Sequence, residues 1–309
     1  MPVLASVFVL VLVLAFAACT PKPAPVDAAP EASIDAGPVR DAAIELDAGP
    51  ILVPGARLSD GCASRSSLAP GLAKDGAIEA AKKKRTYIAS IPQSIHSGSP
   101  LRIVFAFHGD ARTGMNVREG LMLEDHAGDE AIVVYPDGLD KTWKTEDASD
   151  KNPDYVFYDV LLAHFAKSAC LDLARVFLTG HSRGAFFANQ LACRRDVRAV
   201  APIAGGGPYV LPGDAPAKGG LSCRFRPSAM IFHGDADTNV PIGSGRATRD
   251  FWVRANGCKS TTTAFAPSPC VAFDGCEEGR PVIFCSLPKH AHEIWPEAPS
   301  SIWKFFRGF

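Results

Sequence analysis

Residues 175–184 read Arg175-Val176-Phe177-Leu178-Thr179-Gly180-His181-Ser182-Arg183-Gly184, and Ala185-Phe186-Phe187-Ala188-Asn189-Gln190-Leu191-Ala192 follow. The mostly apolar run 175–179 predicts a buried strand, and residues 185–192 predict a helix. Between them the pattern G-x-S-x-G places Ser182 on a sharp turn, where the flanking glycines relieve crowding. The helix start behind Ser182 favours negative charge that develops there. The bare pattern can arise by chance, but its strand–turn–helix context predicts a nucleophilic serine rather than an incidental turn residue.

Further runs of strand length recur on both sides of this stretch, at residues 85–91, 101–107, 131–135, 197–203, 228–232 and 281–285. Most are continuously apolar, which is typical of parallel strands that are buried on both faces. The first run alternates and ends at Pro92, which predicts an early edge strand.

Helix-compatible segments separate or follow these runs, at 155–170 (with Asp154 as its N-cap candidate), 246–256 and 297–307. Because strands and helices alternate, we expect one α/β domain over residues 58–309. Its sheet is predicted to be mostly parallel and doubly wound, with flanking helices.

A serine hydroxyl is a weak nucleophile without a base, and the order of this fold requires an acid and then a histidine downstream. Of the eight histidines, His290 and His292 follow the last predicted strand. The acid is expected after the penultimate strand, where Asp235 and Asp237 are both available. The order of residues alone therefore leaves two candidates for each partner.

An oxyanion that forms during acyl transfer needs two hydrogen-bond donors. One is expected to be the backbone N–H of Arg183, directly after the nucleophile. The other is expected in the loop His108-Gly109-Asp110, where we favour the N–H of Asp110 over its alternative as a solvated loop residue. His108 and His233 each precede a glycine at a strand end, which favours a role in shaping turns.

Four side chains are candidates for contact with a substrate: His108, His181, Trp143 and Trp295. The two tryptophans would line a groove for an aromatic acyl group or a sugar. Buried packing is the alternative for each of them.

The first 19 residues are apolar up to a small-residue segment and Cys19, which predicts an export signal. Phe16-Ala17-Ala18-Cys19 resembles a lipobox, in which the cysteine is acylated; ordinary cleavage nearby is the alternative. The apolar run is short for a permanent membrane span. Residues 20–57 are rich in Ala, Pro and Asp and predict a flexible tether. We therefore expect an exported chain, either lipid-anchored to the cell envelope or secreted, and monomeric.

The formal net charge of −1 gives no indication of a nucleic-acid partner. The run Lys82-Lys83-Lys84-Arg85 is interpreted as a solvated approach to the first strand. No Cys-x-x-Cys pair has histidines at zinc-binding spacing, so no metal site is expected. Eight cysteines remain after Cys19, and an even number in an exported chain predicts disulfides; they are Cys62, Cys170, Cys193, Cys223, Cys258, Cys270, Cys276 and Cys285.

From Arg85 to the C-terminus the chain resembles the feruloyl esterase, acetylxylan esterase and polyhydroxybutyrate depolymerase group of secreted α/β-hydrolases. The resemblance covers most of residues 59–309 and depends on several segments besides the serine motif. They are Asp60-Gly61-Cys62, Arg85-Thr86-Tyr87-Ile88, Phe105-Ala106-Phe107-His108-Gly109, Val134-Tyr135-Pro136-Asp137-Gly138-Leu139, Asp154-Tyr155-Val156-Phe157-Tyr158-Asp159, Cys170-Leu171-Asp172, Leu191-Ala192-Cys193, His233-Gly234-Asp235-Ala236-Asp237, Asn256-Gly257-Cys258, and Gly275-Cys276 through Phe284-Cys285.

The resemblance implies that Asp237, the last residue of a His-Gly-x-x-Asp segment, is the acid and that Asp235 is a loop residue. The family histidine usually follows a glycine-rich segment, which Lys289-His290-Ala291 replaces here. The spacing from Cys285 favours His292, with His290 as the alternative.

The implied activity is hydrolysis of carboxylic esters, in plant cell walls (feruloyl or acetyl) or in a polyhydroxybutyrate-type polyester, through Ser182, His292 and Asp237. It requires no metal or organic cofactor. A prolyl-oligopeptidase-like peptidase and a catalytically inactive surface lipoprotein that binds a ligand are the alternatives.

The family pattern also suggests cysteine pairs. Cys170 and Cys193 should both lie at the end of the sheet away from Ser182, which favours a bridge between them. Cys62–Cys223, Cys258–Cys285 and Cys270–Cys276 are the remaining expected pairs.

Overall fold

The computed structural model describes residues 55–96, 99–209 and 222–309. The predicted export signal at 1–19, the lipid site at Cys19 and the tether up to residue 54 lie outside these residues. Within the described end of the tether, the backbone N–H of Arg57 donates to Oδ1 of Asp172 at 2.9 Å, so the chain already contacts the domain at residue 57.

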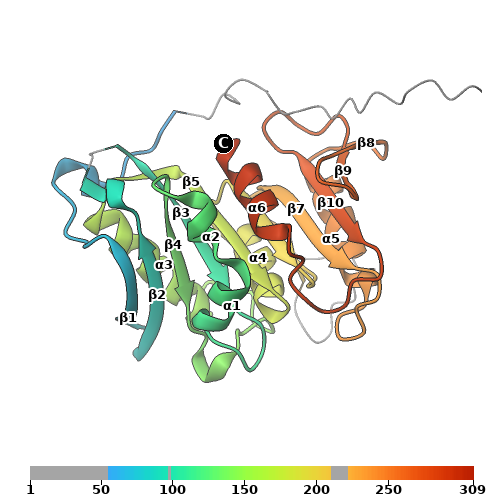
Figure 1. The fold of residues 1–309 in the computed structure, drawn as a ribbon. Helices are drawn as coiled ribbons and strands as arrows, with labels where there is room; N and C mark the ends of the chain where they lie inside the picture. Colours follow the sequence, from blue (N-terminus) through green and yellow to red (C-terminus); the bar gives the residue numbers. More distant parts are fainter. Residues whose placement is uncertain (1–54, 97–98, 210–221) are drawn as a thin grey trace, which may run out of the picture. The chain divides into compact units, whose positions relative to one another are not determined.

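Ten strands form one sheet in the order β1-β2-β4-β3-β5-β6-β7-β10-β9-β8 (Figure 1). Six neighbouring strands, β4, β3, β5, β6, β7 and β10, run parallel, and antiparallel strands extend the sheet at both ends. The strands are β1 (Gly71–Ala80), β2 (Lys83–Ile91), β3 (Leu101–Phe107), β4 (Ala131–Pro136), β5 (Leu171–His181), β6 (Ala199–Ile203), β7 (Ser228–Gly234), β8 (Thr262–Ala264), β9 (Cys270–Phe273) and β10 (Val282–Leu287). The predicted α/β-hydrolase fold, with its mostly parallel sheet, is confirmed.

Helices cover both faces of the sheet, and each face has its own apolar core. One core includes side chains of α3, α4 and α5, such as Tyr155, Phe187 and Trp252. The other includes side chains of α1, α2 and α6, which lie in front of the sheet in Figure 1. The helices are α1 (Gly114–Leu121), α2 (Leu123–Ala127), α3 (Pro153–Ser168), α4 (Arg183–Arg194), α5 (Ile242–Ala255) and α6 (Ala298–Arg307), with short 3-10 turns η1 (Asp60–Ala63), η2 (Gln93–His96) and η3 (Leu139–Lys141).

Two details of the predicted elements were wrong. The strand 85–91 is not at the edge, because β1 pairs with β2 on its outer side. Asp154 is not the N-cap of α3: Asn152 occupies that position and accepts a hydrogen bond from the N–H of Asp154 at 2.9 Å, with Pro153 as the first helical residue.

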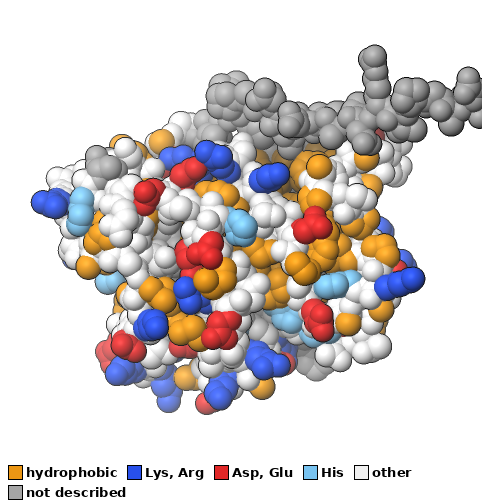
Figure 2. All heavy atoms as spheres, in the orientation of Figure 1, with side chains coloured by type: hydrophobic (Ala, Val, Ile, Leu, Met, Phe, Trp, Pro, Cys, Tyr) orange, Lys and Arg blue, Asp and Glu red, His pale blue; other side chains and the backbone are white. Residues whose placement is uncertain are grey.

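The interpretation of residues 82–85 as fully solvated was wrong for Arg85. Lys83 and Lys84 are exposed, but the Arg85 side chain is buried and lies 2.8 Å from Oδ1 of Asp154. Its guanidinium also lies 4.0 Å above the ring of Phe157. One residue of this basic run, Arg85, therefore forms an ion pair in the core. Elsewhere, Figure 2 shows acidic and basic side chains interspersed over the face that it draws.

All eight expected cysteines are paired, but each expected pairing was wrong. The observed pairs are Cys62–Cys170, Cys193–Cys223, Cys258–Cys276 and Cys270–Cys285. Residues 58–62 follow the start of β5, where the N–H of Ser59 donates to the carbonyl of Leu171 at 2.9 Å, and this places Cys62 rather than Cys193 beside Cys170.

The other pairings also follow from neighbouring backbone. Cys193 ends α4 beside the segment after residue 222, because its carbonyl accepts from the N–H of Arg224 at 2.9 Å. Cys270 and Cys285 face each other across the antiparallel β9–β10 pair.

Within the described residues, no helix combines the length and apolar composition needed to cross a membrane. The same part of the chain contains no group of three or more His, Cys, Asp or Glu residues placed to hold a metal ion.

Candidate active site

Ser182 lies between β5 and α4 with φ 56° and ψ −123°, a left-handed conformation that a non-glycine residue rarely adopts. Close packing keeps the turn in this conformation. A Cβ atom on Gly184 would lie 2.1 Å from the carbonyl oxygen of Phe107, so only glycine fits there. The N–H of Ser182 donates to the carbonyl of Ile203 at 3.0 Å, which attaches the turn to β6. The structure thus has the strained strand-to-helix turn that the G-x-S-x-G pattern predicts.

The loops after β7 and β10 bring Asp237 and His292 together. Nδ1 of His292 lies 2.7 Å from Oδ2 of Asp237, whose side chain is buried, whereas that of His292 is 15% exposed. The other carboxylate oxygen of Asp237 accepts from the N–H groups of Asn239 and Val240 at 2.9 and 2.8 Å. Burial alone would raise the pKa of Asp237, but the bonds from His292 and these N–H groups lower it below its usual value. The acid is therefore held ionised against the imidazole.

The alternative candidates Asp235 and His290 make other contacts in the same loops. Oδ1 of Asp235 accepts from the N–H of Lys289 at 2.6 Å, and the carbonyl of His290 accepts from the N–H of Ala236 at 3.1 Å. A Cβ on Gly234 would lie 2.1 Å from that carbonyl, so the approach of the two loops requires glycine. These contacts set the position of Asp237 relative to His292, and the imidazole of His290 lies instead at the carbonyl of Glu293.

The two residues expected to supply oxyanion donors lie beside Ser182 and contact each other. Nε of Arg183 lies 3.2 Å from Oδ2 of Asp110, and the Asp110 carboxylate also accepts from the hydroxyl of Thr142. A Cβ on Gly109 would lie 3.2 Å from Cβ of Ser182, so this loop touches the nucleophile turn. Within the described residues, neither backbone N–H donates to another protein group.

Two of the four expected substrate contacts were wrong, because burial removes them from any surface. His108 is fully buried; its Nε2 accepts from the N–H of Gly138 at 2.8 Å and its Nδ1 donates to the carbonyl of Gly109 at 2.7 Å. Burial lowers the pKa of His108, so the ring is neutral and shapes the loop. Trp143 is 1% exposed and donates from Nε1 to the carbonyl of His108 at 2.9 Å.

The other two expected contacts lie closer to solvent. His181 is partly exposed, and its ring centroid lies 4.9 Å from that of His292. Burial first, and then the neighbouring His292, lower the pKa of His181 to about 4, so it remains neutral at physiological pH. Trp295 is half-buried, with its ring 6.2 Å from that of Phe232.

A pocket of about 240 Å³ opens beside the nucleophile turn. Gly109 and His181 line it together with four residues that the sequence did not indicate: Arg112, Asn116, Val117 and Ile294. Arg112, Asn116 and Val117 follow the Gly109 loop in the sequence, and Ile294 follows His292. Closeness in sequence to the expected site residues could therefore have indicated them. The pocket offers one cation and one amide beside two apolar side chains.

No protein-family model matches the chain. Curated relatives match most of it: feruloyl esterase D of Neurospora crassa is 28% identical over 280 residues, which cover 81% of this chain and 90% of the relative. Probable feruloyl esterase C of Aspergillus terreus is 29% identical over 280 residues, covering 84% and 95%.

Solved structures share the fold at lower identity. An acetyl xylan esterase from Aspergillus awamori superposes with a TM-score of 0.56 at 18% identity, covering 72% of this chain and 94% of that one. A feruloyl esterase module from Clostridium thermocellum complexed with sinapinate gives 0.53 at 14% identity, covering 82% and 93%. The chain is therefore similar to feruloyl esterases over most of its length, and it shares the α/β-hydrolase fold with the solved esterase structures.

Proposed function

We propose that this chain is an exported esterase that cleaves ester bonds of plant cell-wall polysaccharides, with Ser182 as nucleophile, His292 as base and Asp237 as the acid that orients it. The observation that carries the proposal is the 2.7 Å contact between Asp237 and His292, in loops at the same edge of the sheet as the Ser182 turn. The names of the relatives, feruloyl esterases C and D, favour feruloyl esters as the substrate class.

The proposed reaction is acyl transfer through a covalent intermediate. Nδ1–H of His292 donates to Asp237, which leaves Nε2 free to take the Ser182 proton as Oγ attacks the ester carbonyl. His292 then gives that proton to the departing alcohol. Water, deprotonated by the same imidazole, attacks the acyl-enzyme and releases the carboxylic acid, after which the proton returns to Ser182.

The oxyanion of each tetrahedral intermediate would accept from the N–H groups of Arg183 and Asp110. The ion pair between their side chains supports this role, since it holds the two loops at a fixed separation. Removing one such donor typically costs about 10²–10³-fold in kcat.

The test is hydrolysis of p-nitrophenyl acetate and of a substrate panel: methyl ferulate, acetylated xylan and short hydroxybutyrate oligomers. We expect the full chain, with its disulfides intact, to hydrolyse p-nitrophenyl acetate and to prefer methyl ferulate within the panel. Ser182→Ala should abolish both activities while the far-UV circular dichroism and Tm stay unchanged. An oxidised, folded sample with no esterase activity would overturn the proposal and favour the inactive ligand-binding alternative.

The proposal also includes export of the chain and its attachment to the membrane through an acylated Cys19. Four disulfides are the expected property of a chain that folds in an oxidising compartment. Acylation of Cys19 is tested by mass spectrometry of the mature N-terminus: a diacylglyceryl-modified cysteine supports it, and an unmodified terminus at another residue contradicts it.

A further inference from the structure

A second cavity, of about 700 Å³, lies at the opposite edge of the sheet from Ser182. Five arginines line it, and we call it the arginine cavity: Arg57, Arg198, Arg224, Arg226 and Arg280. Arg198, Arg226 and Arg280 lie one or two residues before the parallel strands β6, β7 and β10. The proposed catalytic residues instead follow the carboxyl ends of β5, β7 and β10. The arginine cavity is therefore separate from the site of ester cleavage.

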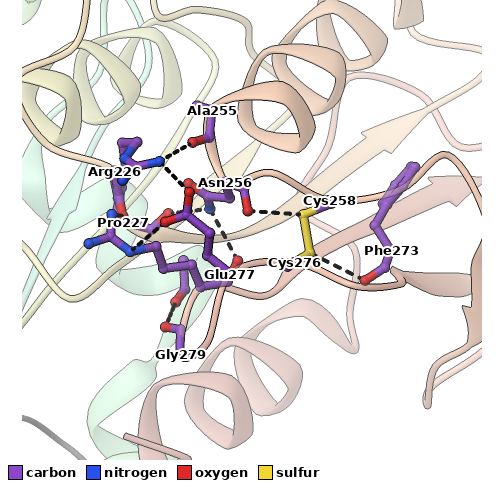
Figure 3. The surroundings of a disulfide bond; sticks show 11 residues. Arg226, Pro227, Ala255, Asn256, Cys258, Phe273, Cys276, Glu277 and Gly279 are labelled. Carbon is purple, nitrogen blue, oxygen red and sulfur yellow. Dashed lines mark hydrogen bonds and ion pairs between the residues drawn. A yellow bond between two sulfur atoms is a disulfide. The ribbon is translucent and has the colours of Figure 1, made fainter.

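Part of this positive charge is already paired with carboxylates and carbonyls of the protein itself. Nη1 of Arg226 donates to the carbonyl of Ala255 at 2.9 Å and lies 2.6 Å from Oε1 of Glu277 (Figure 3). Glu277 is shared, because its other oxygen lies 3.8 Å from Arg280. Arg57 pairs with Asp196 at 2.9 Å, where both side chains are more than half exposed.

Two cations remain without an ion pair among the described residues: Arg198 and Arg224. Arg198 donates to Oγ of Ser228 and to the carbonyl of Gly279, both neutral groups, at 3.2 and 2.8 Å. Its guanidinium packs 3.9 Å above the ring of Phe309, while that of Arg224 lies 5.5 Å above Phe225.

The surplus is electrostatically unfavourable for the protein alone. The lining has five arginines and two carboxylates, Asp196 and Glu278; with Glu277, which pairs with Arg226 and Arg280, an excess of two positive charges remains in a chain whose net charge is −1. Burial first, and then the neighbouring Arg280, lower the pKa of Arg198 to about 10. A bound anion would offset both effects, because a guanidinium binds carboxylates through two parallel hydrogen bonds.

We propose that the arginine cavity binds the carboxylates of an acidic polysaccharide, such as a polyuronate, and so holds the enzyme on polymeric material. The choice of a polysaccharide rests on the proposed function, whereas the anionic character of the ligand rests on the arginines themselves. The cavity volume lies in the range of pockets that take small ligands, so it admits a short stretch of polymer rather than a single carboxylate.

The experiment measures binding of oligogalacturonate by isothermal titration calorimetry to the full chain carrying Ser182→Ala, so that catalysis plays no part. Arg57→Gln/Arg224→Gln removes two exposed cavity charges. Lys83→Gln/Lys84→Gln, in the β1–β2 hairpin, removes two exposed charges elsewhere and is the matched control. Neutral xylo-oligosaccharide and inorganic phosphate are the ligand controls.

We expect saturable binding of oligogalacturonate that weakens with added NaCl and falls about tenfold in the arginine variant, as expected for the loss of two charge-assisted contacts. The lysine variant should bind as Ser182→Ala does, and neither control ligand should bind comparably. Equal weakening in both double variants, equal binding of phosphate, or no binding of oligogalacturonate would each overturn the inference. Because methyl ferulate hydrolysis by the unmodified chain is measured separately, failure of this inference and failure of the proposed esterase activity are distinguishable.

Discussion

Asp237 and His292 lie 55 residues apart in the chain, yet Oδ2 of the first is 2.7 Å from Nδ1 of the second. A backbone contact between Ala236 and His290 and the absence of a side chain at Gly234 bring their loops together. Asp237 and His292 therefore meet because each follows the end of a strand, and these two strands, β7 and β10, are neighbours in the sheet.

Asp237→Asn should lower kcat for p-nitrophenyl acetate by about 10⁴-fold, because an amide favours the wrong tautomer of the histidine. Asp235→Asn is the matched control, since an amide oxygen can still accept from the N–H of Lys289. Steady-state kinetics at pH 7.5 check the prediction. Comparable losses in both variants would mean that a disturbed loop, rather than the loss of the Asp237 carboxylate, lowers kcat.

His292→Ala should remove nearly all activity, about 10⁴-fold or more in kcat, whereas His290→Ala should cost only a few-fold. The reason is that the imidazole of His290 lies at the carbonyl of Glu293 and that of His292 lies at Asp237. Steady-state kinetics compare the two variants, whose Tm values are checked to be equal. The reverse ranking would reassign the base to His290.

The stability of the enzyme should fall as the pH decreases from 6.5 to 4. The folded state holds His181 neutral with its pKa lowered to about 4, so the unfolded chain binds more protons in this window and is favoured there. The contribution is fully present above pH 6.5 and amounts to about 3 kcal/mol at most. His181→Gln should therefore flatten the plot of unfolding free energy against pH.

Urea unfolding at several pH values provides the measurement for this prediction. His126→Gln, at an exposed position in α2, is the matched histidine control. An equally large change of slope in both variants would refute the assignment to His181.

Arg85→Met should destabilise the domain by about 3–5 kcal/mol, because it leaves the buried carboxylate of Asp154 without its cation. Arg85→Met/Asp154→Leu should recover part of this loss, since no unpaired charge remains. Urea unfolding of the oxidised protein at pH 7 measures both. Arg307→Met, which breaks an exposed pair with Glu130, should cost about 1 kcal/mol or less, and a loss as large as that of Arg85→Met would contradict the role of burial.

The disulfide Cys62–Cys170 should stabilise the domain more than Cys270–Cys285. Their cysteines are 108 and 15 residues apart, and the chain-entropy model gives about 4.7 and 3 kcal/mol for loops of roughly these lengths. Paired Cys→Ala variants compared by urea unfolding test the order. Peptide mapping without reduction checks the four pairings, and recovery of a Cys170–Cys193 peptide would contradict them.

The sequence predicted those parts of the molecule that depend on neighbouring residues. The turn at Ser182 was predictable because the strand, the glycines and the helix that create it are contiguous. Six parallel strands were predictable because burial on both faces requires unbroken apolar runs. By contrast β1, at residues 71–80, has no apolar run longer than two residues and is exposed or half-buried at all but its last position, so it gave no such signal.

The features that sequence reasoning missed depend on distant segments. The cysteine pairs follow from residues 58–62 lying along β5 and from the register of β9 with β10, neither of which has a local pattern. The order of residues along the chain left both Asp235 and Asp237 as candidates for the acid. The resemblance favoured Asp237, and the loop contacts in the structure then distinguished the two. His108 was expected either at the substrate or in shaping a turn, and Trp143 either at the substrate or in the core. The structure has the second arrangement for each, with Nε1 of Trp143 donating to the carbonyl of His108.

The attachment of Cys62 to Cys170 also has a mechanical consequence. Tension applied along the N-terminal segment would reach the start of β5 through a covalent bond, in the middle of the sheet, instead of peeling an edge strand away by breaking hydrogen bonds one at a time. An enzyme pulled by its N-terminus would therefore resist unzipping, and the opposite end of β5, where Ser182 lies, would keep its shape under that force.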